Sequence, residues 1–263
     1  MFNFFLNPKF EKLFHLNQAE GFTQFWNLPA LRAVTRRRTS DVCRVTLPGS
    51  DVTAYLKRYW YPSLYDRSKG FFRNTFFGMS RAAREYRSLS RLCAARCSRV
   101  RPIAYGEERT LRLLKRAFII TEELPGSITL EDLCRSSSFD AWPSRRRRRL
   151  FAALGNWVRT FHDRGFRDGD LFSRNIVVHE KGEDFAFSKI DSPAGSGGGK
   201  PPGSGSVFPR DIVDLDADTA GTVNEPDRLR FLLAYLAESG VNSAVRFFLT
   251  RTMTRREKEP GKE

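Results

Sequence analysis

Residues 161–175 read Phe-His-Asp-Arg-Gly-Phe-Arg-Asp-Gly-Asp-Leu-Phe-Ser-Arg-Asn, and this stretch decides the fold of the chain. Asp170 is followed at once by Leu171, and Asn175 lies five positions after Asp170. The apolar run 176–178 that comes next is typical of a strand. A tight loop before a strand can direct a carboxylate and an amide oxygen into one cleft, where the first accepts a proton and the second helps to hold a metal ion.

This spacing is the Asp-Leu-x-x-x-Asn half of the catalytic loop of kinases. In that loop the Asp accepts the proton of the attacking hydroxyl group, and the Asn helps to hold magnesium on the nucleotide phosphates. Taken alone, the motif is equally typical of an ordinary turn between a helix and a strand, because Asp and Asn hydrogen-bond to their own backbone in loops. The order of the other segments decides between the two interpretations.

Composition sets limits on the class of protein. The chain has 263 residues, of which 40% are hydrophobic, so it can form one large domain or two lobes. Its 45 Lys and Arg residues outnumber 30 Asp and Glu residues, which gives a net charge of +15. This excess favours an anionic partner such as phosphates, nucleic acid or an acidic membrane surface. A generally basic surface without any single partner is the alternative.

The cysteines and the apolar residues indicate the compartment. Cys43, Cys93, Cys97 and Cys134 form no Cys-x-x-Cys pair and no cluster with histidine, so we expect no zinc site, and reduced thiols in the cytoplasm. Residues 1–32 are rich in phenylalanine but too polar for a signal peptide or a spanning helix. We expect them to form a helical extension that packs on the body of the protein, and we expect no segment to cross a membrane.

The first half of the chain offers a lysine and a glutamate in kinase order. Two β-rich runs, 42–47 and 52–59, predict a hairpin with Lys57 in its second strand. Residues 79–97 have a helical period, and Glu85 lies at the edge of the apolar stripe, from which it can reach inward to Lys57. Kinases use such a pair to hold the α- and β-phosphates. The alternatives are a lysine on an exposed strand and a surface pair between Glu85 and a neighbouring arginine.

A strand at 117–121 continues into a short linker. In kinases a linker at this place holds adenine through backbone groups, which leave little trace in the sequence. On position alone, Glu122, Glu123 and Leu124 are candidates for this contact.

The clearest predicted helix covers residues 144–163, and it begins with five consecutive arginines at 145–149. Positive charge at a helix N-terminus opposes the helix dipole. An anionic lipid or phosphate would relieve this conflict, and a solvated basic turn is the alternative interpretation.

The segment after the loop supplies a further acid. A return strand, 185–191, ends at Asp191, where a kinase has its second magnesium carboxylate, although Ser-Pro follows here in place of Phe-Gly. An Asp that merely caps a strand end is the alternative. Residues 192–209 are rich in Gly, Ser and Pro and are expected to be flexible, in the place of an activation segment.

The order of these parts is hard to obtain by chance, although each part is weak evidence alone. We therefore predict an α+β, protein-kinase-like bilobal fold with a small β-rich N-lobe, which contains one key helix, and a mostly helical, reduced C-lobe. The predicted parts are an aromatic-rich extension at 1–32, a nucleotide-binding N-lobe at 33–124, a catalytic C-lobe at 125–250 with the flexible 192–209 insert, and a charged, frayed tail at 251–263.

Several stretches together resemble the bacterial lipopolysaccharide kinase family, the Kdo and heptose kinases of the inner core. They are Tyr-Leu-Lys-Arg-Tyr at 55–59, Arg-Glu-Tyr at 84–86, Arg-Pro-Ile-Ala-Tyr-Gly at 101–106, His-Asp-Arg-Gly-Phe at 162–166 with Asp-Leu at 170–171, Ile-Asp at 190–191, and Asp-Arg-Leu-Arg-Phe-Leu-x-x-Tyr-Leu at 227–236. The resemblance covers about residues 35–240. It implies transfer of phosphate from ATP, with Mg²⁺, to a sugar hydroxyl of an anionic lipid-linked saccharide at the cytoplasmic face of the inner membrane.

The resemblance also implies a role for each site residue. Lys57 would bind phosphate, Glu85 would position Lys57, Asp170 would be the base, and Asn175 and Asp191 would hold magnesium. The net positive charge agrees with a phosphorylated, membrane-borne acceptor and with peripheral contact with the inner membrane.

The chain departs from the family pattern at two places. Asp168 stands where family members often have histidine, so a second acid lies near Asp170; we assign the base to Asp170 because only it has the Leu and Asn at the motif spacing. No Gly-rich loop precedes Lys57, and the corresponding region holds three arginines at 36–38. These arginines can meet phosphates directly, and loose nucleotide binding is the alternative.

Other functions remain as hypotheses. A small-molecule phosphotransferase of the aminoglycoside or choline kinase type typically has an acidic acceptor pocket, which a basic chain does not favour. A catalytically weak pseudokinase or binding module would fit the two departures. A nucleic-acid-binding protein would explain the charge but not the ordered acids, and no recognition motif is present, so we expect no nucleic acid partner. The sequence leaves the acceptor sugar and the oligomeric state open.

Overall fold

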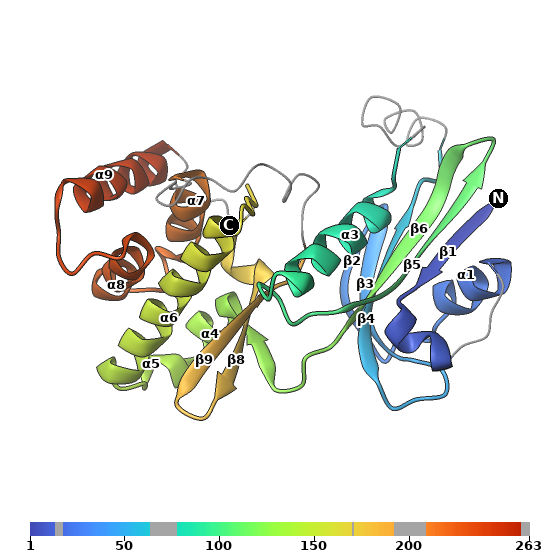
Figure 1. Ribbon diagram of the computed structural model, residues 1–263, viewed down its shortest axis with the longest axis horizontal. Helices are drawn as coiled ribbons and strands as arrows, with labels where there is room; N and C mark the ends of the chain where they lie inside the picture. Colours follow the sequence, from blue (N-terminus) through green and yellow to red (C-terminus); the bar gives the residue numbers. More distant parts are fainter. Residues whose placement is uncertain (14–17, 64–77, 170, 192–208, 259–263) are drawn as a thin grey trace. The chain divides into compact units, whose positions relative to one another are not determined.

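The computed structural model describes residues 1–13, 18–63, 78–169, 171–191 and 209–258. The chain divides into two compact units (Figure 1). The first contains Met1–Cys93 and Val100–Leu124, and the second contains Ala94–Arg99 and Pro125–Glu263. The residues that the sequence analysis set apart as an extension, 1–32, belong to the first unit together with the N-lobe strands.

The first unit is built on a six-stranded antiparallel sheet. The strands follow the order β1-β5-β6-β4-β3-β2. Its strands and helices are β1 (Phe2–Leu6), the 3₁₀ helix η1 (Pro8–Leu13), α1 (Gln18–Trp26), β2 (Arg32–Arg37), β3 (Ser40–Thr46), β4 (Thr53–Trp60), α3 (Arg81–Ala94), β5 (Pro102–Thr110) and β6 (Leu113–Glu122).

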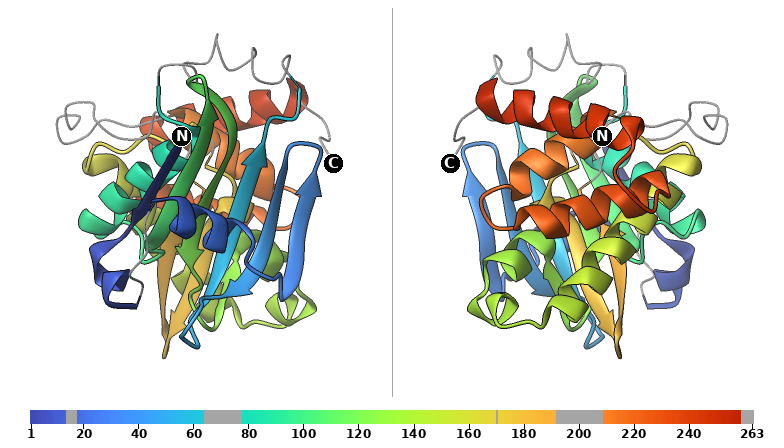
Figure 2. Two further views of the ribbon diagram at one scale, coloured as in Figure 1. Left: turned by 90° about the vertical axis from the view of Figure 1, so that its right-hand side faces the viewer. Right: turned by 90° about the vertical axis from the view of Figure 1, so that its left-hand side faces the viewer.

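Successive side chains of a strand point to opposite faces of the sheet, and a different helix packs on each face. On one face, Ala54 and Leu56 of β4 are fully buried in a cluster with Phe22 and Phe25 of α1. On the other face β4 meets α3. Figure 1 shows α1 and α3 on opposite sides of the sheet, and the left view of Figure 2 looks onto the side that α1 covers.

The predicted hairpin and helix of the first unit are confirmed, with ends displaced by a few residues. The predicted runs 42–47 and 52–59 are β3 and β4, and the helix predicted at 79–97 is α3. The prediction that residues 1–32 form a helical lead-in was wrong for their first part. Phe2–Leu6 is a strand, β1, that pairs with β5. Phe4 is buried against Phe25 and Phe118, so this segment gains more as an edge strand of an aromatic core than as a helix.

The second unit is mostly helical around a small sheet of order β7-β8-β9. Its elements are β7 (Ser127–Thr129), α4 (Leu130–Arg135), α5 (Ser137–Asp140), α6 (Ser144–Asp163), the 3₁₀ helix η2 (Ser173–Asn175), β8 (Ile176–Lys181), β9 (Asp184–Lys189), α7 (Pro209–Thr219), α8 (Glu225–Leu236) and α9 (Ser243–Lys258). The right view of Figure 2 faces α7, α8 and α9.

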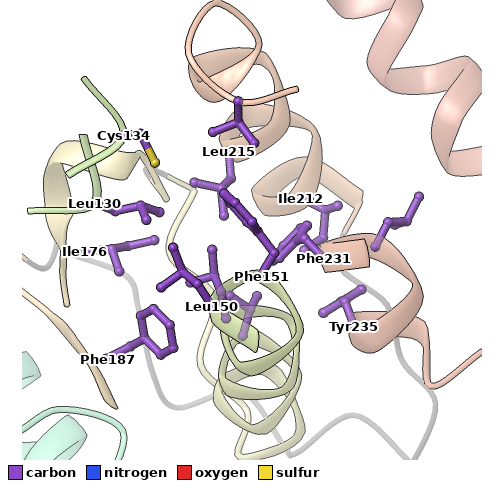
Figure 3. Close-up of a cluster of buried hydrophobic side chains, with 14 of the residues drawn as sticks. Leu130, Cys134, Leu150, Phe151, Ile176, Phe187, Ile212, Leu215, Phe231 and Tyr235 are labelled. Carbon is purple, nitrogen blue, oxygen red and sulfur yellow. The ribbon is translucent and has the colours of Figure 1, made fainter. Parts of the chain in front are cut away.

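Helix α6 is the centre of the core of this unit. Its apolar stripe meets side chains from the sheet and from α4, α7 and α8 (Figure 3). The labelled members are Leu130, Cys134, Leu150, Phe151, Ile176, Phe187, Ile212, Leu215, Phe231 and Tyr235. Gly155 allows α6 to lie close to α8, since a Cβ atom at this position would clash with the carbonyl oxygen of Phe231.

Two predictions for the C-terminal half need correction. Helix α9 continues to Lys258, so residues 251–258 are helical and not a frayed tail. Helix α7 was not predicted, because its acids, at 211, 214, 216 and 218, were interpreted only as polar positions. They alternate with Ile212, Val213 and Leu215, which are buried, so the segment is an amphipathic helix. The predicted flexible segment lies outside the described residues except for Pro209, which begins α7.

The arginine-rich start of α6 has partners within its own unit. Arg146 pairs with Glu180 at 2.8 Å, and Arg149 pairs with Glu183 and Asp184. Arg147 Nε lies 3.3 Å from Oδ2 of Asp227 in α8. Acids therefore relieve the conflict with the helix dipole that the sequence showed, without a lipid. In the part of the chain that the structure describes, no helix combines the length and the apolar sequence needed to span a bilayer.

Candidate functional site

The structure brings Lys57 and Glu85 together within the first unit. Lys57 Nζ lies 3.4 Å from Glu85 Oε1, and the hydroxyl group of Tyr59 donates a hydrogen bond of 3.0 Å to Glu85 Oε2. Lys57 and Tyr59 are two residues apart on β4, so both point to the face on which α3 lies. Glu85 is 5% exposed, and it is therefore an inward-facing glutamate and not a member of a surface pair.

The start of α3 is tied to the sheet by a glutamate that the sequence analysis missed. Glu107 of β5 accepts a hydrogen bond of 3.0 Å from the backbone N–H of Ser80, and it pairs with Arg109 at 2.9 Å. The Ser80 hydroxyl in turn accepts a hydrogen bond from the backbone N–H of Ala83, as an N-cap does. These contacts fix the position of α3 on the sheet, and with it the position of Glu85. Only the capping serine left a signal in the sequence.

The glutamates of the linker already have partners. Glu122 pairs with Arg101 at 2.5 Å, and Glu123 pairs with Arg44 at 2.8 Å. Burial works to raise the pKa of Glu123, but hydrogen bonds from Thr53 and Arg44 outweigh it and lower the pKa. The backbone N–H groups of both glutamates also donate within the unit, to Arg101 and Thr53. An adenine ring would therefore have to meet other backbone groups of the segment that ends at Leu124.

In the second unit, Asp170 lies outside the described residues, but the loop is held on both sides of it. Asp211 accepts hydrogen bonds from the backbone N–H groups of Asp168, at 2.9 Å, and Gly169, at 2.7 Å. Asp218 accepts a bond of 2.7 Å from the N–H of Ser173 and one of 2.5 Å from its hydroxyl group. Asp211 and Asp218 are seven residues apart on α7, about two turns, so they lie on one side of the helix. One helix thus holds the loop on both sides of position 170.

A buried histidine supports the first of these anchors. His162 is fully buried; its Nδ1 lies 2.8 Å from the Tyr235 hydroxyl oxygen and its Nε2 lies 3.1 Å from Asp211. Burial raises the pKa of Asp211, but hydrogen bonds from His162 and from the backbone of the loop outweigh it, and the pKa is lowered. Asp211 therefore stays ionised and keeps its acceptor role. The sequence analysis assigned no role to His162 or Asp211.

The two predicted metal ligands come from adjacent segments. The backbone N–H of Ile190 donates a hydrogen bond of 2.9 Å to the carbonyl oxygen of Asn175, which ties the end of the loop to the residue before Asp191. Asp191 has a φ of 50°, a left-handed conformation that is uncommon outside glycine.

This pair of donors fits magnesium. Mg²⁺ prefers oxygen ligands, and it is usually held by one or two carboxylates together with water and substrate phosphates. The amide of Asn175 and the carboxylate of Asp191, on these adjacent segments, are such a donor set. Among the residues that the structure describes, His, Cys, Asp and Glu form no group of three that could hold a metal ion without a substrate.

The second acid of the loop, Asp168, has a partner of its own. Lys189 Nζ lies 2.8 Å from Asp168 Oδ2, and both side chains are fully buried. The sequence analysis did not identify Lys189. The four cysteines are free thiols, and burial raises the pKa of Cys134 to about 12, so this thiol stays protonated at neutral pH.

Comparison with known proteins identifies the family. The model of the lipopolysaccharide kinase (Kdo/WaaP) family matches residues 25–192, more than half of the chain. The chain belongs to this family. The match includes Lys57, Glu85, Asn175 and Asp191, and it confirms the resemblance seen in the sequence.

Individual relatives in the family are distant. The chain is 31% identical over 98 residues to the lipopolysaccharide core heptose(I) kinase WaaP of Escherichia coli K12, covering 37% of each chain. It is 28% identical over 114 residues to the enzyme of that name from Pseudomonas aeruginosa, covering 42% of each chain. These alignments span less than half of the length of the curated relatives.

A solved structure extends the similarity of fold over almost the whole chain. The structure of WaaP in complex with acyl carrier protein matches with a TM-score of 0.66 at 20% identity, covering 97% of this chain and 98% of that chain. The predicted α+β, kinase-like bilobal fold class is confirmed.

Proposed function

We propose that this protein is a phosphotransferase that uses ATP and Mg²⁺ to phosphorylate a sugar hydroxyl group of the lipopolysaccharide inner core or of a similar lipid-linked glycan. The observation that carries the proposal is the contact between Lys57 and Glu85, on strand β4 and helix α3. A buried glutamate that meets a lysine in this arrangement is the phosphate-positioning pair of kinases. Membership of the Kdo/WaaP family supplies the class of acceptor.

Each site residue has a role in this proposal. Lys57, held by Glu85, binds the nucleotide phosphates, and Asn175 and Asp191 hold magnesium on them. Asp170 accepts the proton of the sugar hydroxyl as that oxygen bonds to the γ-phosphorus, while the bond from this phosphorus to the β,γ-bridging oxygen breaks and ADP leaves. Bound magnesium would neutralise the charge that develops on the phosphate oxygens.

Heptose is the first acceptor to test. The curated relatives are named heptose(I) kinases, and Kdo, the other sugar in the family description, is the second. The net charge of +15 supports an anionic, membrane-borne acceptor and peripheral contact with the cytoplasmic face of the inner membrane.

The test is transfer of labelled γ-phosphate from ATP to a panel of lipid-linked core saccharides. We compare the wild type with Asp170→Asn, which keeps the size of the side chain and removes the base. Asp51→Asn is the matched control, because Asp51 is exposed in the turn between β3 and β4. We expect the wild type and the control to label one lipid in a magnesium-dependent reaction, and Asp170→Asn to label none at a measurable rate.

Three other outcomes separate the alternatives. Labelling of a small cationic molecule in preference to every lipid would indicate an aminoglycoside-kinase type. Absence of both transfer and magnesium-dependent nucleotide binding would indicate a pseudokinase or binding module. Equal transfer by Asp170→Asn would remove Asp170 from the mechanism but leave the activity.

An acyl carrier protein is a second partner to test. The matching solved structure is a complex of WaaP with acyl carrier protein, and the fold similarity covers 97% of this chain. Co-elution with acyl carrier protein in size-exclusion chromatography would support this partner, and separate elution at micromolar concentrations would argue against it.

A further inference from the structure

Lys189 is a fully buried lysine at the end of β9. A lysine at full burial is rare, because removal of an ammonium group from water is costly unless opposite charge and hydrogen bonds replace the water. The site and the family match assign no function to this residue. Its surroundings therefore have to explain why the chain keeps a charge there.

Three oxygen atoms surround the ammonium group. Lys189 Nζ lies 2.8 Å from Asp168 Oδ2, donates a hydrogen bond of 3.2 Å to the carbonyl oxygen of Ile190, and donates one of 2.8 Å to the carbonyl oxygen of Asp191. Two of these oxygens accept hydrogen bonds from the ammonium group, and the third belongs to the carboxylate that pairs with it. The ion pair with Asp168 supplies the opposite charge.

The contact with Asp191 explains an unusual backbone conformation. Asp191 has a φ of 50°, which costs free energy for a residue with a Cβ atom and persists only where surrounding contacts enforce it. The hydrogen bond from Lys189 holds the carbonyl group of this residue. The peptide unit between Ile190 and Asp191 is held by the hydrogen bond from Lys189 to the carbonyl oxygen of Ile190, and the unit before that one is held by the bond from the Ile190 N–H to Asn175. The direction of the Asp191 side chain is thereby fixed from both sides.

Asp168 connects this arrangement to the loop. Its backbone N–H is held by Asp211 of α7, and its carboxylate meets Lys189. The loop that contains position 170 and the segment directly after β9 that contains Asp191 are therefore joined by an ion pair as well as by the backbone bond to Asn175. A general base must lie within hydrogen-bond reach of the substrate proton, whereas the Asp168 side chain is fully buried beside Lys189.

We propose that Lys189 is a positioning residue that sets the metal-binding geometry of Asp191, and that Asp168 is the counter-ion of Lys189 and not a second base. The inference rests on the proposed function, in which Asp191 holds magnesium. It assigns a role to an acid that the sequence left undecided, and it names a lysine that no motif contains.

The test measures metal binding as well as turnover. We compare the wild type with Lys189→Met, which keeps most of the volume and removes the three donors, and with the double variant Asp168→Asn/Lys189→Met, which leaves no unpaired charge. Lys181→Met is the matched control, since Lys181 is an exposed lysine at the end of β8. Binding of Mn²⁺ in the presence of ADP is followed by electron paramagnetic resonance, and folding by thermal unfolding.

We expect Lys189→Met to weaken Mn²⁺ binding by about tenfold or more, as removal of outer-shell partners does at other metal sites. The double variant should recover part of the lost thermal stability, because no buried charge is left alone, but it should not recover the metal affinity. The control should match the wild type in both. Wild-type Mn²⁺ affinity in a folded Lys189→Met or double variant would overturn the inference, because a merely structural lysine affects stability alone.

Asp168→Asn separates the counter-ion role from a base role. If Asp168 is a counter-ion, Asp168→Asn should weaken Mn²⁺ binding. Turnover at saturating metal should then fall by the same factor as the Mn²⁺ affinity or by a smaller one. A complete loss of turnover with unchanged Mn²⁺ affinity would overturn the inference in favour of a second base. Asp191→Asn tests the proposed function itself. Unchanged Mn²⁺ binding in this variant would contradict the magnesium role of Asp191. Loss of Mn²⁺ binding in Asp191→Asn but not in Lys189→Met would contradict only the role of Lys189.

Discussion

At the scale of single residues, the site depends on charges that are partly or fully removed from water. Glu85 is the clearest case, since it has 5% of its surface exposed and accepts from both Lys57 and Tyr59. Hydrogen bonds to a charged group contribute about 1.5–3 kcal/mol. The glutamate therefore restricts where the lysine ammonium group can lie, which in the proposed function is the position that meets the nucleotide phosphates.

Glu85→Gln should lower kcat/KM for ATP by about tenfold or more, because each 1.36 kcal/mol of lost transition-state stabilisation is a factor of about ten. Glutamine keeps an acceptor for Tyr59 but removes the charge that orients Lys57, so the fold should persist. Steady-state kinetics with Glu238→Gln, an exposed position just after α8, provide the comparison. Equal kcat/KM for both variants would show that the pair does not position Lys57.

Asp211 makes stability depend on pH in the acid range. Its folded pKa is lowered from its ordinary value of 3.8, so its contribution is fully present above that value and is lost as the pH falls through the lower folded pKa. Urea unfolding at several pH values should show the wild type more stable than Asp211→Asn at neutral pH. The difference should narrow as the pH falls below about 4. A difference that stays constant down to the acid transition would mean that the carboxylate charge is not the source.

At the scale of elements, two helices hold their surroundings through charges at defined positions. Helix α7 presents Asp211 and Asp218 to the loop on both sides of position 170. Helix α6 presents arginines to the β8–β9 hairpin and to Asp227, the buried acid near the start of α8. In both cases an acid or base that looks like surface charge in the sequence joins two elements.

Arg147→Met should destabilise the protein by about 1–3 kcal/mol, because it removes one of the two arginines that pair with the buried carboxylate of Asp227. Arg230 would remain as the other partner. Arg148→Met, in the same run but exposed, should change the free energy of unfolding by no more than about 0.5 kcal/mol. Urea denaturation measures both values. Equal effects would mean that the run acts only through its total charge.

At the scale of the whole molecule, the excess of positive charge is the dominant property, with 45 basic and 30 acidic residues. Many of these charges are paired within one unit, but a net charge of +15 remains. A charge of this size attracts anionic surfaces over about one Debye length, which shrinks as salt is added.

The protein should therefore sediment with vesicles that contain anionic phospholipid at low salt and be released at about 0.5 M salt, where screening is strong. Vesicles of neutral phosphatidylcholine are the control and should bind none. Binding to both kinds, insensitive to salt, would indicate apolar contact, and binding to neither would remove the proposed peripheral contact with the membrane.

The sequence by itself determined the elements with a strong period and the motifs within them. Strand β4 with Lys57, helix α3 with Glu85, and helix α6 follow from the alternation or spacing of apolar residues, which is a local property. The fixed spacing of Asp170 and Asn175 and the order of segments were enough to predict the kinase-like fold class, and the resemblance of several stretches indicated the family. These features need no knowledge of which distant residues meet.

Only the tertiary structure decided the partners. Strand β1 pairs with β5, so that Phe2 lies opposite Glu108, a residue more than a hundred positions later in the chain. No local pattern encodes such a pairing. The same is true of Asp168 with Lys189 and of the loop with Asp211. Polar residues carry no period, and the energy of a buried charge depends on what surrounds it after folding. For this reason the sequence did not predict helix α7, which holds the candidate active-site loop in place.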